Sequence, residues 1–287
     1  MECNQHGTIS LMSHTLKLLL KIILERCRSR IRPEIAQCQY GFMPDRRTRN
    51  AIFIMRMLSE RSIEHQQNIY VCFIVYKKAF DRVRHKRLFR LLKNIRIDDK
   101  DYRLIYNLYR HQKGAVKLPT GLTEWTEINR GVRQGCVMSP DFFNLYGENV
   151  LRLLEESDDD VLINGTHINN IKYADDIVLI ADNEEVLQRL MDLVVDASSD
   201  EGLEINNKKT YCMVISKDSQ GLPISINFDF FKLTVRWFAL NHSQTNSMSQ
   251  FRDFSRTSAL LAEVYSTVSS ANSVTRQELR MLGRSFI

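Results

Sequence analysis

Two adjacent carboxylates between two β-prone runs constrain this chain more than any other feature. Residues 171–181 read Ile-Lys-Tyr-Ala-Asp-Asp-Ile-Val-Leu-Ile-Ala, so Asp175 and Asp176 stand where the two runs meet. Such runs with a minimal connection predict a hairpin whose turn displays acidic side chains. Because adjacent strand residues point to opposite faces, we expect only one aspartate to face a given site fully. Rigidly held carboxylates suit hard divalent cations, whereas an isolated Asp-Asp pair is more often a solvated turn.

The composition fits a globular protein and admits nucleic-acid partners. The 287 residues are 44% hydrophobic and 26% charged, enough for one large domain or two small ones. A net charge of +6 fits nucleic-acid contact without establishing it. Six cysteines without a Cys-x-x-Cys pair predict reduced thiols in an intracellular protein, nuclear or cytoplasmic and not secreted. Lys17 and Lys21 interrupt the apolar segment 16–24, so we expect no membrane span.

Two helices joined by a basic loop are predicted before the first strand. Residues 13–31 have helical apolar spacing, with Ser13 as N-cap and Pro33 as the stop. The arginines in its last turn either complement the helix dipole or form an RNA-facing patch. Loop 39–50 carries three arginines and opens a helix at 51–62, where guanidinium and backbone N–H groups can grip phosphate.

The middle of the chain alternates predicted strands and helices. We expect a buried strand at 68–76, helices at 86–94 and 99–111, and a strand pair at 115–118 and 124–129. In the segment 131–140, two glycines around Arg133 and Gln134 allow close backbone approach to a ligand. Ser139 followed by proline predicts the N-cap of the next helix. A helix at 184–200 and a glycine turn feeding a strand up to residue 215 follow, and the chain is serine-rich beyond residue 216.

Five motifs in order resemble a known family. They are Gln-Tyr-Gly-Phe-x-Pro at 39–44, Phe-Ile-x-Tyr-Lys-Lys-Ala-Phe-Asp at 73–81, Gly-Val-Arg-Gln-Gly-Cys-x-x-Ser-Pro at 131–140, Tyr-Ala-Asp-Asp at 173–176 and Gly-Leu-x-Ile-Asn-x-x-Lys-Thr at 202–210. Each is weak alone, but together and at these intervals they are similar to the reverse transcriptase domain of non-LTR retrotransposons. The resemblance covers residues 6 to 216, about three quarters of the chain.

The resemblance implies an α+β fold, a right-hand polymerase with helical fingers and a small antiparallel palm sheet packed on helices. We expect fingers helices and their loop at 1–67 and the palm at 68–216, with a fingers insertion at about 86–130. Residues 217–287 form a serine-rich tail of unknown fold, either disordered or a degenerate thumb, since no thumb is recognisable. With no endonuclease domain before residue 6, we expect a truncated or decayed copy of an element.

The resemblance also implies RNA-templated DNA synthesis by two-metal nucleotidyl transfer, with Mg²⁺, or alternatively Mn²⁺, as the cofactor. The expected partners are an RNA template, a DNA primer and a dNTP, and the oligomeric state stays open. Further expectations concern seven residues. Asp175 is the principal metal ligand and Asp176 the weaker one, Phe80 excludes a 2′-hydroxyl, Gln134 and Gly135 lie against the nucleotide and template, Lys209 protonates pyrophosphate, and Arg46 contacts the triphosphate.

One departure from the family pattern concerns the metal site directly. Val75 stands where the family has a metal-bridging aspartate, and valine offers no oxygen. Asp81 lies past the strand end and is expected to cap the following helix instead. If the lost ligand removes about 4 kcal/mol of transition-state stabilisation, the rate falls about a thousandfold. We therefore expect a weak or inactive polymerase. The fingers loop departs too, with Met43, Asp45 and Arg47 in place of an arginine and two glycines.

Two alternatives remain open at this point. The first rival to a weak polymerase is a non-catalytic nucleic-acid-binding remnant of a retrotransposon polymerase. The second is a product that never folds stably because its thumb is missing. Paired carboxylates also occur in nucleotide cyclases, but the motifs at 73–81 and 131–140 argue against that class.

Overall fold

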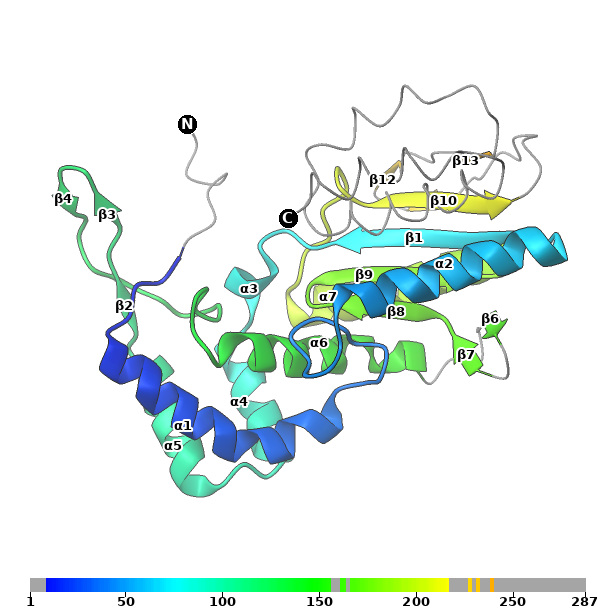
Figure 1. Cartoon of the computed structure of the whole chain (residues 1–287). Helices are drawn as coiled ribbons and strands as arrows, with labels where there is room; N and C mark the ends of the chain where they lie inside the picture. Colours follow the sequence, from blue (N-terminus) through cyan, green and yellow to red (C-terminus); the bar gives the residue numbers. More distant parts are fainter. Residues whose placement is uncertain are drawn as a thin grey trace, which may run out of the picture.

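The structure is a computed structural model that describes residues 9–155, 161–163 and 166–216, together with three short strands beyond them. Its centre is a five-stranded sheet in the order β13-β10-β1-β9-β8 (Figure 1). These strands are β1 (Ile69–Val75), β8 (Asn170–Tyr173), β9 (Asp176–Ala181), β10 (Tyr211–Ser216) and β13 (Phe238–Ala239). The predicted strand at 68–76 and the predicted hairpin around the two aspartates are confirmed.

Seven α-helices are described outside the sheet. They are α1 (His14–Ile31), α2 (Thr48–His65), α3 (Ala79–Arg82), α4 (His85–Asn94), α5 (Asp99–Tyr109), α6 (Ser139–Glu155) and α7 (Glu184–Glu201), with a 3₁₀ turn, η2 (Arg32–Glu34), after α1. The predicted helix at 51–62 is longer at both ends than its apolar pattern indicated. Among the described residues, no helix combines the length and apolar character needed to cross a membrane.

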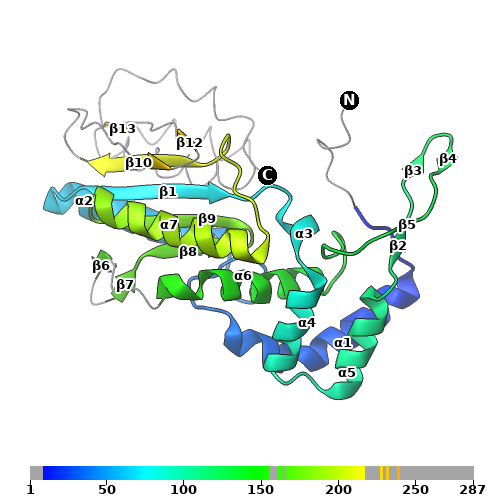
Figure 2. The same cartoon turned by 180° about the vertical axis from the view of Figure 1, so that it is seen from behind.

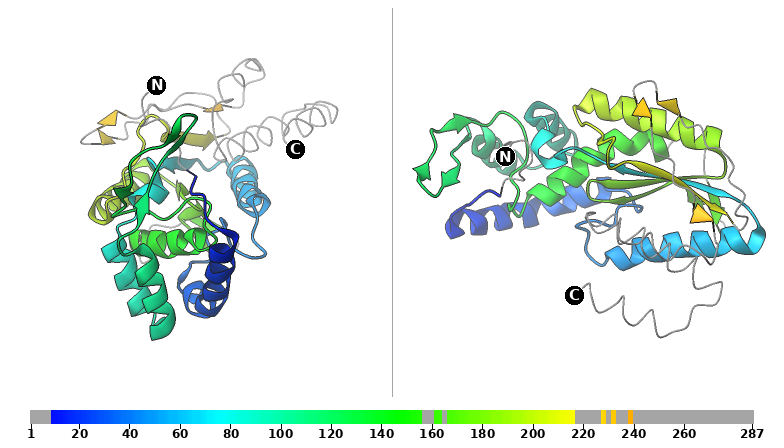
Figure 3. Two further views of the ribbon diagram at one scale, coloured as in Figure 1. Left: turned by 90° about the vertical axis from the view of Figure 1, so that its left-hand side faces the viewer. Right: turned by 90° about the horizontal axis from the view of Figure 1, so that it is seen from above.

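The sheet is covered on both faces, which explains why β1 is an almost continuous apolar run. Val71 and Phe73 pack toward α2, while Cys72 and Ile74 belong to the larger core formed with α6 and α7. Viewed along the sheet, α2 lies on one side and α6 and α7 on the other (Figure 3). The view from behind shows α7 in front of the strands and α6 below them (Figure 2). The chain thus forms three layers with β1 in the middle.

Helices α1, α4 and α5 form a second group beside α6 (Figure 1). Ser13 caps α1 as predicted, because its hydroxyl accepts a hydrogen bond from the Leu16 amide at 3.2 Å. Two arginines of the basic C-terminal part of α1 form ion pairs with neighbouring elements. Arg26 lies 3.1 Å from Asp101 on α5, and Arg28 lies 3.5 Å from Asp141 on α6. These two arginines therefore connect helices within the protein.

The strand pair predicted at 115–118 and 124–129 is present but broken into two short ladders. Strand β2 (Lys113–Gly114) pairs with β5 (Thr126–Glu127), and β3 (Lys117–Leu118) pairs with β4 (Gly121–Leu122). Between the ladders, the Thr123 hydroxyl accepts from the Val116 amide at 2.9 Å. The Thr123 amide also donates to the Val116 carbonyl at 3.0 Å, so one backbone and one side-chain bond join the strands between the ladders. The hairpin projects from the molecule (Figure 1).

The remaining strands are short. They are β6 (Val161–Ile163) paired with β7 (Thr166–Ile168), and β11 (Asn227–Phe228) paired with β12 (Phe231–Lys232). Strand β13 runs parallel to β10, with Phe238 opposite Ile215. Apart from β11, β12 and β13, the predicted serine-rich tail at 217–287 lies outside the described residues. The expected boundaries of fingers, palm and tail stay predictions.

Candidate active site

The two aspartates lie at a tight turn, as predicted. Tyr173 pairs with Asp176, so Ala174 and Asp175 alone form the β8–β9 connection. Ala174 has a φ of 59°, a left-handed conformation that alanine adopts only when its surroundings hold it there. Asp176 begins β9 and is 7% exposed, whereas Asp175 in the turn is half-buried. The two carboxylates therefore occupy different environments, one in the ladder and one in the turn.

The C-terminal end of β1 lies directly beside these carboxylates. Val75, the last residue of β1, is the cross-strand partner of Asp176. Directly opposed residues of an antiparallel pair project to the same face, so the valine and the carboxylate are neighbours. Val75 is 9% exposed and belongs to neither cluster of packed core residues. An aliphatic side chain therefore lies beside Asp176 at the end of β1.

The oxygen donors at this corner suit one divalent cation better than two. Mg²⁺ is commonly held by one or two carboxylates, with water and substrate phosphates completing its shell. Asp175 and Asp176 are the residues that would hold such an ion. A second ion needs a bridging oxygen that Val75 does not supply, and in the described part of the chain no group of three or more His, Cys, Asp or Glu is placed to hold a metal.

The expectation that Asp81 caps the following helix is wrong. Asp81 lies inside the one-turn helix α3, and its Oδ1 accepts from the Gln134 side-chain amide at 3.0 Å. The residue before α4 is Arg84, whose side chain makes no capping bond. The reason is that residues 131–132 run along α3, with the Val132 amide donating to the Phe80 carbonyl at 2.8 Å. This contact brings two predicted nucleotide-binding residues, Phe80 and Gln134, to neighbouring positions.

Phe80 is half-buried in a small aromatic cluster. Its ring stacks on Phe143 of α6 at 4.5 Å between centroids and meets Phe42 edge-on at 6.4 Å. The three rings come from the loop before α2 (Phe42), from α3 (Phe80) and from α6 (Phe143), so the cluster connects these elements. Gly135 is exposed with a φ of 93°, a conformation that favours glycine, and the Gln134 carbonyl accepts from the Ser10 amide at 2.9 Å.

Ser139 does not take the N-cap position predicted for it. Helix α6 begins at Ser139 itself, and its hydroxyl donates to the Arg133 carbonyl at 2.7 Å. The Ser139 side chain therefore links the loop at 131–138 to the first turn of α6.

Arg46 has an internal role that sequence patterns did not reveal. Its Nη1 donates to the carbonyls of Ala36, Gln37 and Gln39 at 3.0–3.1 Å, which holds the loop before α2 in a closed shape. A contact of Arg46 with a triphosphate stays a prediction. Lys209 is exposed, and its amide donates to the Asn206 carbonyl at 2.9 Å. Since the Asn206 amide donates to the Val75 carbonyl at 2.7 Å, this turn is fixed to the end of β1.

Two buried polar residues that support the hairpin were missed in the sequence. The side-chain oxygen of Gln39 accepts from the amides of Gly41 and Ala174 at 2.7 and 2.9 Å. Lys172, 1% exposed, donates to Glu148 and Glu155. A lysine inside a β-prone run was the available signal for the second residue.

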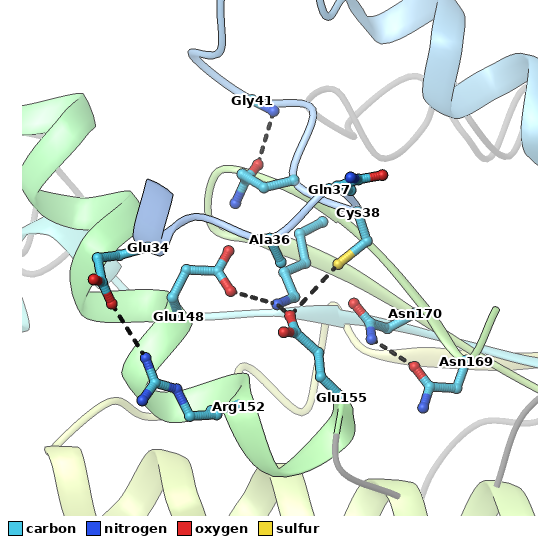
Figure 4. Close-up of polar contacts among 12 residues, drawn as sticks. Glu34, Ala36, Gln37, Cys38, Gly41, Glu148, Arg152, Glu155, Asn169 and Asn170 are labelled. Atoms are coloured by element: carbon cyan, nitrogen blue, oxygen red, sulfur yellow. Dashed lines mark hydrogen bonds and ion pairs between the residues drawn. The ribbon is translucent and has the colours of Figure 1, made fainter. Parts of the chain in front are cut away.

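The surroundings of Lys172 keep its ammonium group charged. Figure 4 shows Glu148, Glu155 and Cys38 converging from α6 and from the loop before α2. Burial alone would lower the pKa of Lys172, but the neighbouring Cys38, Glu148 and Glu155 more than compensate, and the pKa is raised. The strand that leads into the carboxylate turn is therefore tied to α6 by charge.

Comparison with known proteins identifies the family of the chain. Residues 4–284 match the family model described as reverse transcriptase (RNA-dependent DNA polymerase). The chain is 28% identical over 177 residues to the retrovirus-related Pol polyprotein from type-1 retrotransposable element R2 of Nasonia vitripennis, which covers 62% of this chain and 17% of that protein. It is 28% identical over 207 residues to the polyprotein from type-2 retrotransposable element R2DM of Drosophila melanogaster, covering 72% and 19%.

The fold agrees with a solved structure as well. Telomerase from Candida tropicalis, in complex with a fragment of telomeric RNA, superposes with a TM-score of 0.50 at 15% identity, over 72% of this chain and 35% of that one. The chain spans less than a fifth of the length of the two curated relatives. The mixed architecture is that of polymerase fingers and palm. The chain belongs to the reverse transcriptase (RNA-dependent DNA polymerase) family, of the type found in non-LTR retrotransposons.

Proposed function

We propose that this domain binds an RNA template, a DNA primer and a dNTP at the end of β1, and that it extends the primer only slowly. The observation that carries the proposal is the pairing of Val75 with Asp176 across the β1–β9 ladder. It puts an aliphatic side chain beside the carboxylate pair, at the position where the family pattern has an aspartate. In this proposal the site lies at the end of β1 and lacks one oxygen donor.

In this proposal the residues at the strand end divide the work. Asp175 and Asp176 hold a divalent cation, Mg²⁺ or Mn²⁺, which when bound orients the triphosphate and neutralises charge on the leaving pyrophosphate. Phe80 contacts the sugar and excludes a 2′-hydroxyl. Gln134, oriented by Asp81, and Gly135 lie against the incoming nucleotide and template, and Arg46 contacts the triphosphate.

Lys209 completes the site as a proton donor to the departing pyrophosphate. Its turn is fixed to the Val75 carbonyl through Asn206, which supports a position at the same end of the sheet. The missing oxygen at residue 75 affects the transition state most, because a bound cation stabilises the charge that develops there on the attacking and leaving oxygens. A deficit of about 4 kcal/mol corresponds to about a thousandfold in rate.

Primer extension on an RNA template tests the proposal, in Mg²⁺ and separately in Mn²⁺. We expect slow extension by the chain as it stands and about a thousandfold faster extension by Val75→Asp. Val75→Leu is the matched control, since it changes the side chain without adding an oxygen, and it is expected to extend as slowly as the parent. Extension by the parent at the rate of Val75→Asp would overturn the proposal.

A nucleic-acid-binding protein without polymerase chemistry is the second candidate. The two-carboxylate donor set, with no third ligand in the part of the chain described, favours it. In that case Val75→Asp stays inactive, while the parent binds RNA with an affinity that falls steeply as salt is raised. Asp176→Asn separates the two candidates further, because it abolishes incorporation by Val75→Asp only if that variant is a polymerase.

A further inference from the structure

A buried side chain joins the loop before α2 to the carboxylate turn. Residues 38–41, here called the docking segment, lie along β8, and Gln39 forms a parallel bridge with Lys172. The Tyr40 amide donates to the Lys172 carbonyl at 2.8 Å, and the Lys172 amide donates to the Cys38 carbonyl at 2.9 Å. The docking segment therefore pairs with the edge of the sheet through one bridge next to the turn.

The Gln39 side chain satisfies a backbone group that the turn itself leaves without a partner. In a two-residue hairpin, the amide of the first turn residue has no ladder partner. That residue is Ala174, which is 9% exposed, so its amide needs an acceptor from within the protein. Gln39 is 3% exposed, and its Oε1 atom accepts a hydrogen bond from the Ala174 amide at 2.9 Å.

Close backbone packing holds this acceptor in place. A Cβ atom on Gly41 would lie 2.2 Å from the Ala174 nitrogen, so only glycine allows the docking segment to come this near. The Gly41 amide donates to the same Gln39 oxygen at 2.7 Å. Its carbonyl accepts from the buried Asn144 side chain of α6 at 2.9 Å. Hydrogen bonds within the protein therefore fix both sides of the contact.

We propose that Gln39 is a positioning residue, which fixes the left-handed backbone of Ala174 and thereby the direction of the Asp175 carboxylate. This inference rests on the proposed function, because it assigns Asp175 a metal ion to hold. Gln39 itself does not reach the reacting atoms. Residues that orient metal ligands contribute by preventing the ligand from rotating away, and their loss typically costs 10–100-fold in metal affinity or activity.

The experiment compares Gln39→Met, which keeps the bulk but removes the acceptor, with Gln39→Glu, which keeps an oxygen in place. Ser62→Ala is the matched control. Ser62 is also buried and donates to the Ile215 carbonyl, but Ile215 pairs with Ile69 at the opposite end of β1. Each substitution is made in the full chain, both with Val75 and with Val75→Asp.

Three readouts are measured on these variants. The first is hydrogen exchange of the Ala174 amide, which needs no activity. The second is Mn²⁺ affinity by electron paramagnetic resonance, and the third is kcat and KM for primer extension. The last two are measured in the Val75→Asp series.

We expect Gln39→Met to speed Ala174 exchange and to weaken Mn²⁺ binding and kcat about 10–100-fold, with the primer–template KM unchanged. Gln39→Glu and Ser62→Ala are expected to retain parental values for all three. Unchanged Ala174 exchange and Mn²⁺ affinity in Gln39→Met would overturn the inference, as would equal losses in Gln39→Met and Gln39→Glu. If Val75→Asp neither binds Mn²⁺ nor extends, the proposed function fails, and the Ala174 exchange rate still shows whether Gln39 fixes the turn.

Discussion

Lys172 on β8 and Glu148 on α6 form an ion pair in the protein interior, with 2.8 Å between Nζ and Oε2 and side-chain exposures of 1% and 5%. Glu155 is the last residue of α6, and its Oε1 lies 3.0 Å from the same Lys172 nitrogen; its side chain is 41% exposed. The pair links the strand that enters the carboxylate turn to the helix behind the sheet. A buried pair contributes little net stability when intact, but it is costly to break because the remaining charge has no partner.

Replacing Lys172 by methionine is therefore expected to lower the free energy of unfolding by about 3–5 kcal/mol, since Glu148 keeps its charge in the interior. Adding Glu148→Gln to Lys172→Met removes that charge and is expected to recover most of the loss. Arg152→Ala is the control, because this arginine forms an exposed pair with Glu34 at 3.5 Å and its loss is expected to cost less than about 1 kcal/mol. Urea denaturation of the variants checks all three.

Two glycine-to-alanine changes test the close approach at the turn. Gly41→Ala puts a methyl group against the Ala174 backbone and is expected to destabilise the fold by about 1–3 kcal/mol. Gly147→Ala, inside α6 with nothing within 4 Å of the added atom, is expected to be neutral or to stabilise by up to about 1 kcal/mol. Equal melting temperatures for the two variants would contradict the docking of residue 41 on the turn.

The metal site makes a prediction about stability as well as rate. Val75→Asp adds a third carboxylate next to Asp176 at a position that is 9% exposed. Without metal, we expect a loss of about 1–3 kcal/mol in unfolding free energy. Mg²⁺ is expected to raise the melting temperature of Val75→Asp more than that of the parent, because a bound ligand stabilises the native state. Val75→Asn, which adds polarity without charge, is expected to respond to Mg²⁺ less than the aspartate variant does.

His85 predicts how stability depends on pH. Its Nε2 lies 2.8 Å from the Gly131 carbonyl, to which it donates. Burial lowers the pKa of His85 below 6.5, and the Arg133 charge lowers it further, against an opposing contribution from the Gly131 hydrogen bond. As pH falls below 6.5, the unfolded chain binds a proton more readily than the folded one, so stability falls. The fall between pH 7 and pH 5 is expected to be smaller in His85→Gln, as measured by thermal melting.

Local signals in the sequence were sufficient for several elements of the site. The apolar spacing of α1, the β-prone run of β1 and the two runs around Asp175 each predict one element without help from the rest of the chain. The family motifs added the expectation that Val75 lies at the metal position, and the β1–β9 register puts it opposite Asp176.

The supporting contacts could not be predicted in the same way. Gln39 and Ala174 are 135 positions apart, and the acceptor role of Gln39 depends on the docking segment lying along β8. Arg46 resembles a phosphate-binding residue in sequence, yet its main partners are three carbonyls whose positions only the folded loop defines. The partner of Asp81 could not be foreseen either, because the Gln134 amide from which it accepts lies 53 positions away. Its place just before a helix therefore suggested a cap instead.

The docking segment has a further consequence for solubility. Strand β8 is the last strand on its side of the described sheet, and an uncovered strand edge is a template for pairing with another chain. On that edge, Cys38 and Tyr40 form hydrogen bonds with the backbone amide and carbonyl of Lys172. The contact that shapes the turn thus also covers part of this edge, and a chain that lost it would leave the backbone groups of Lys172 open to pairing with another chain.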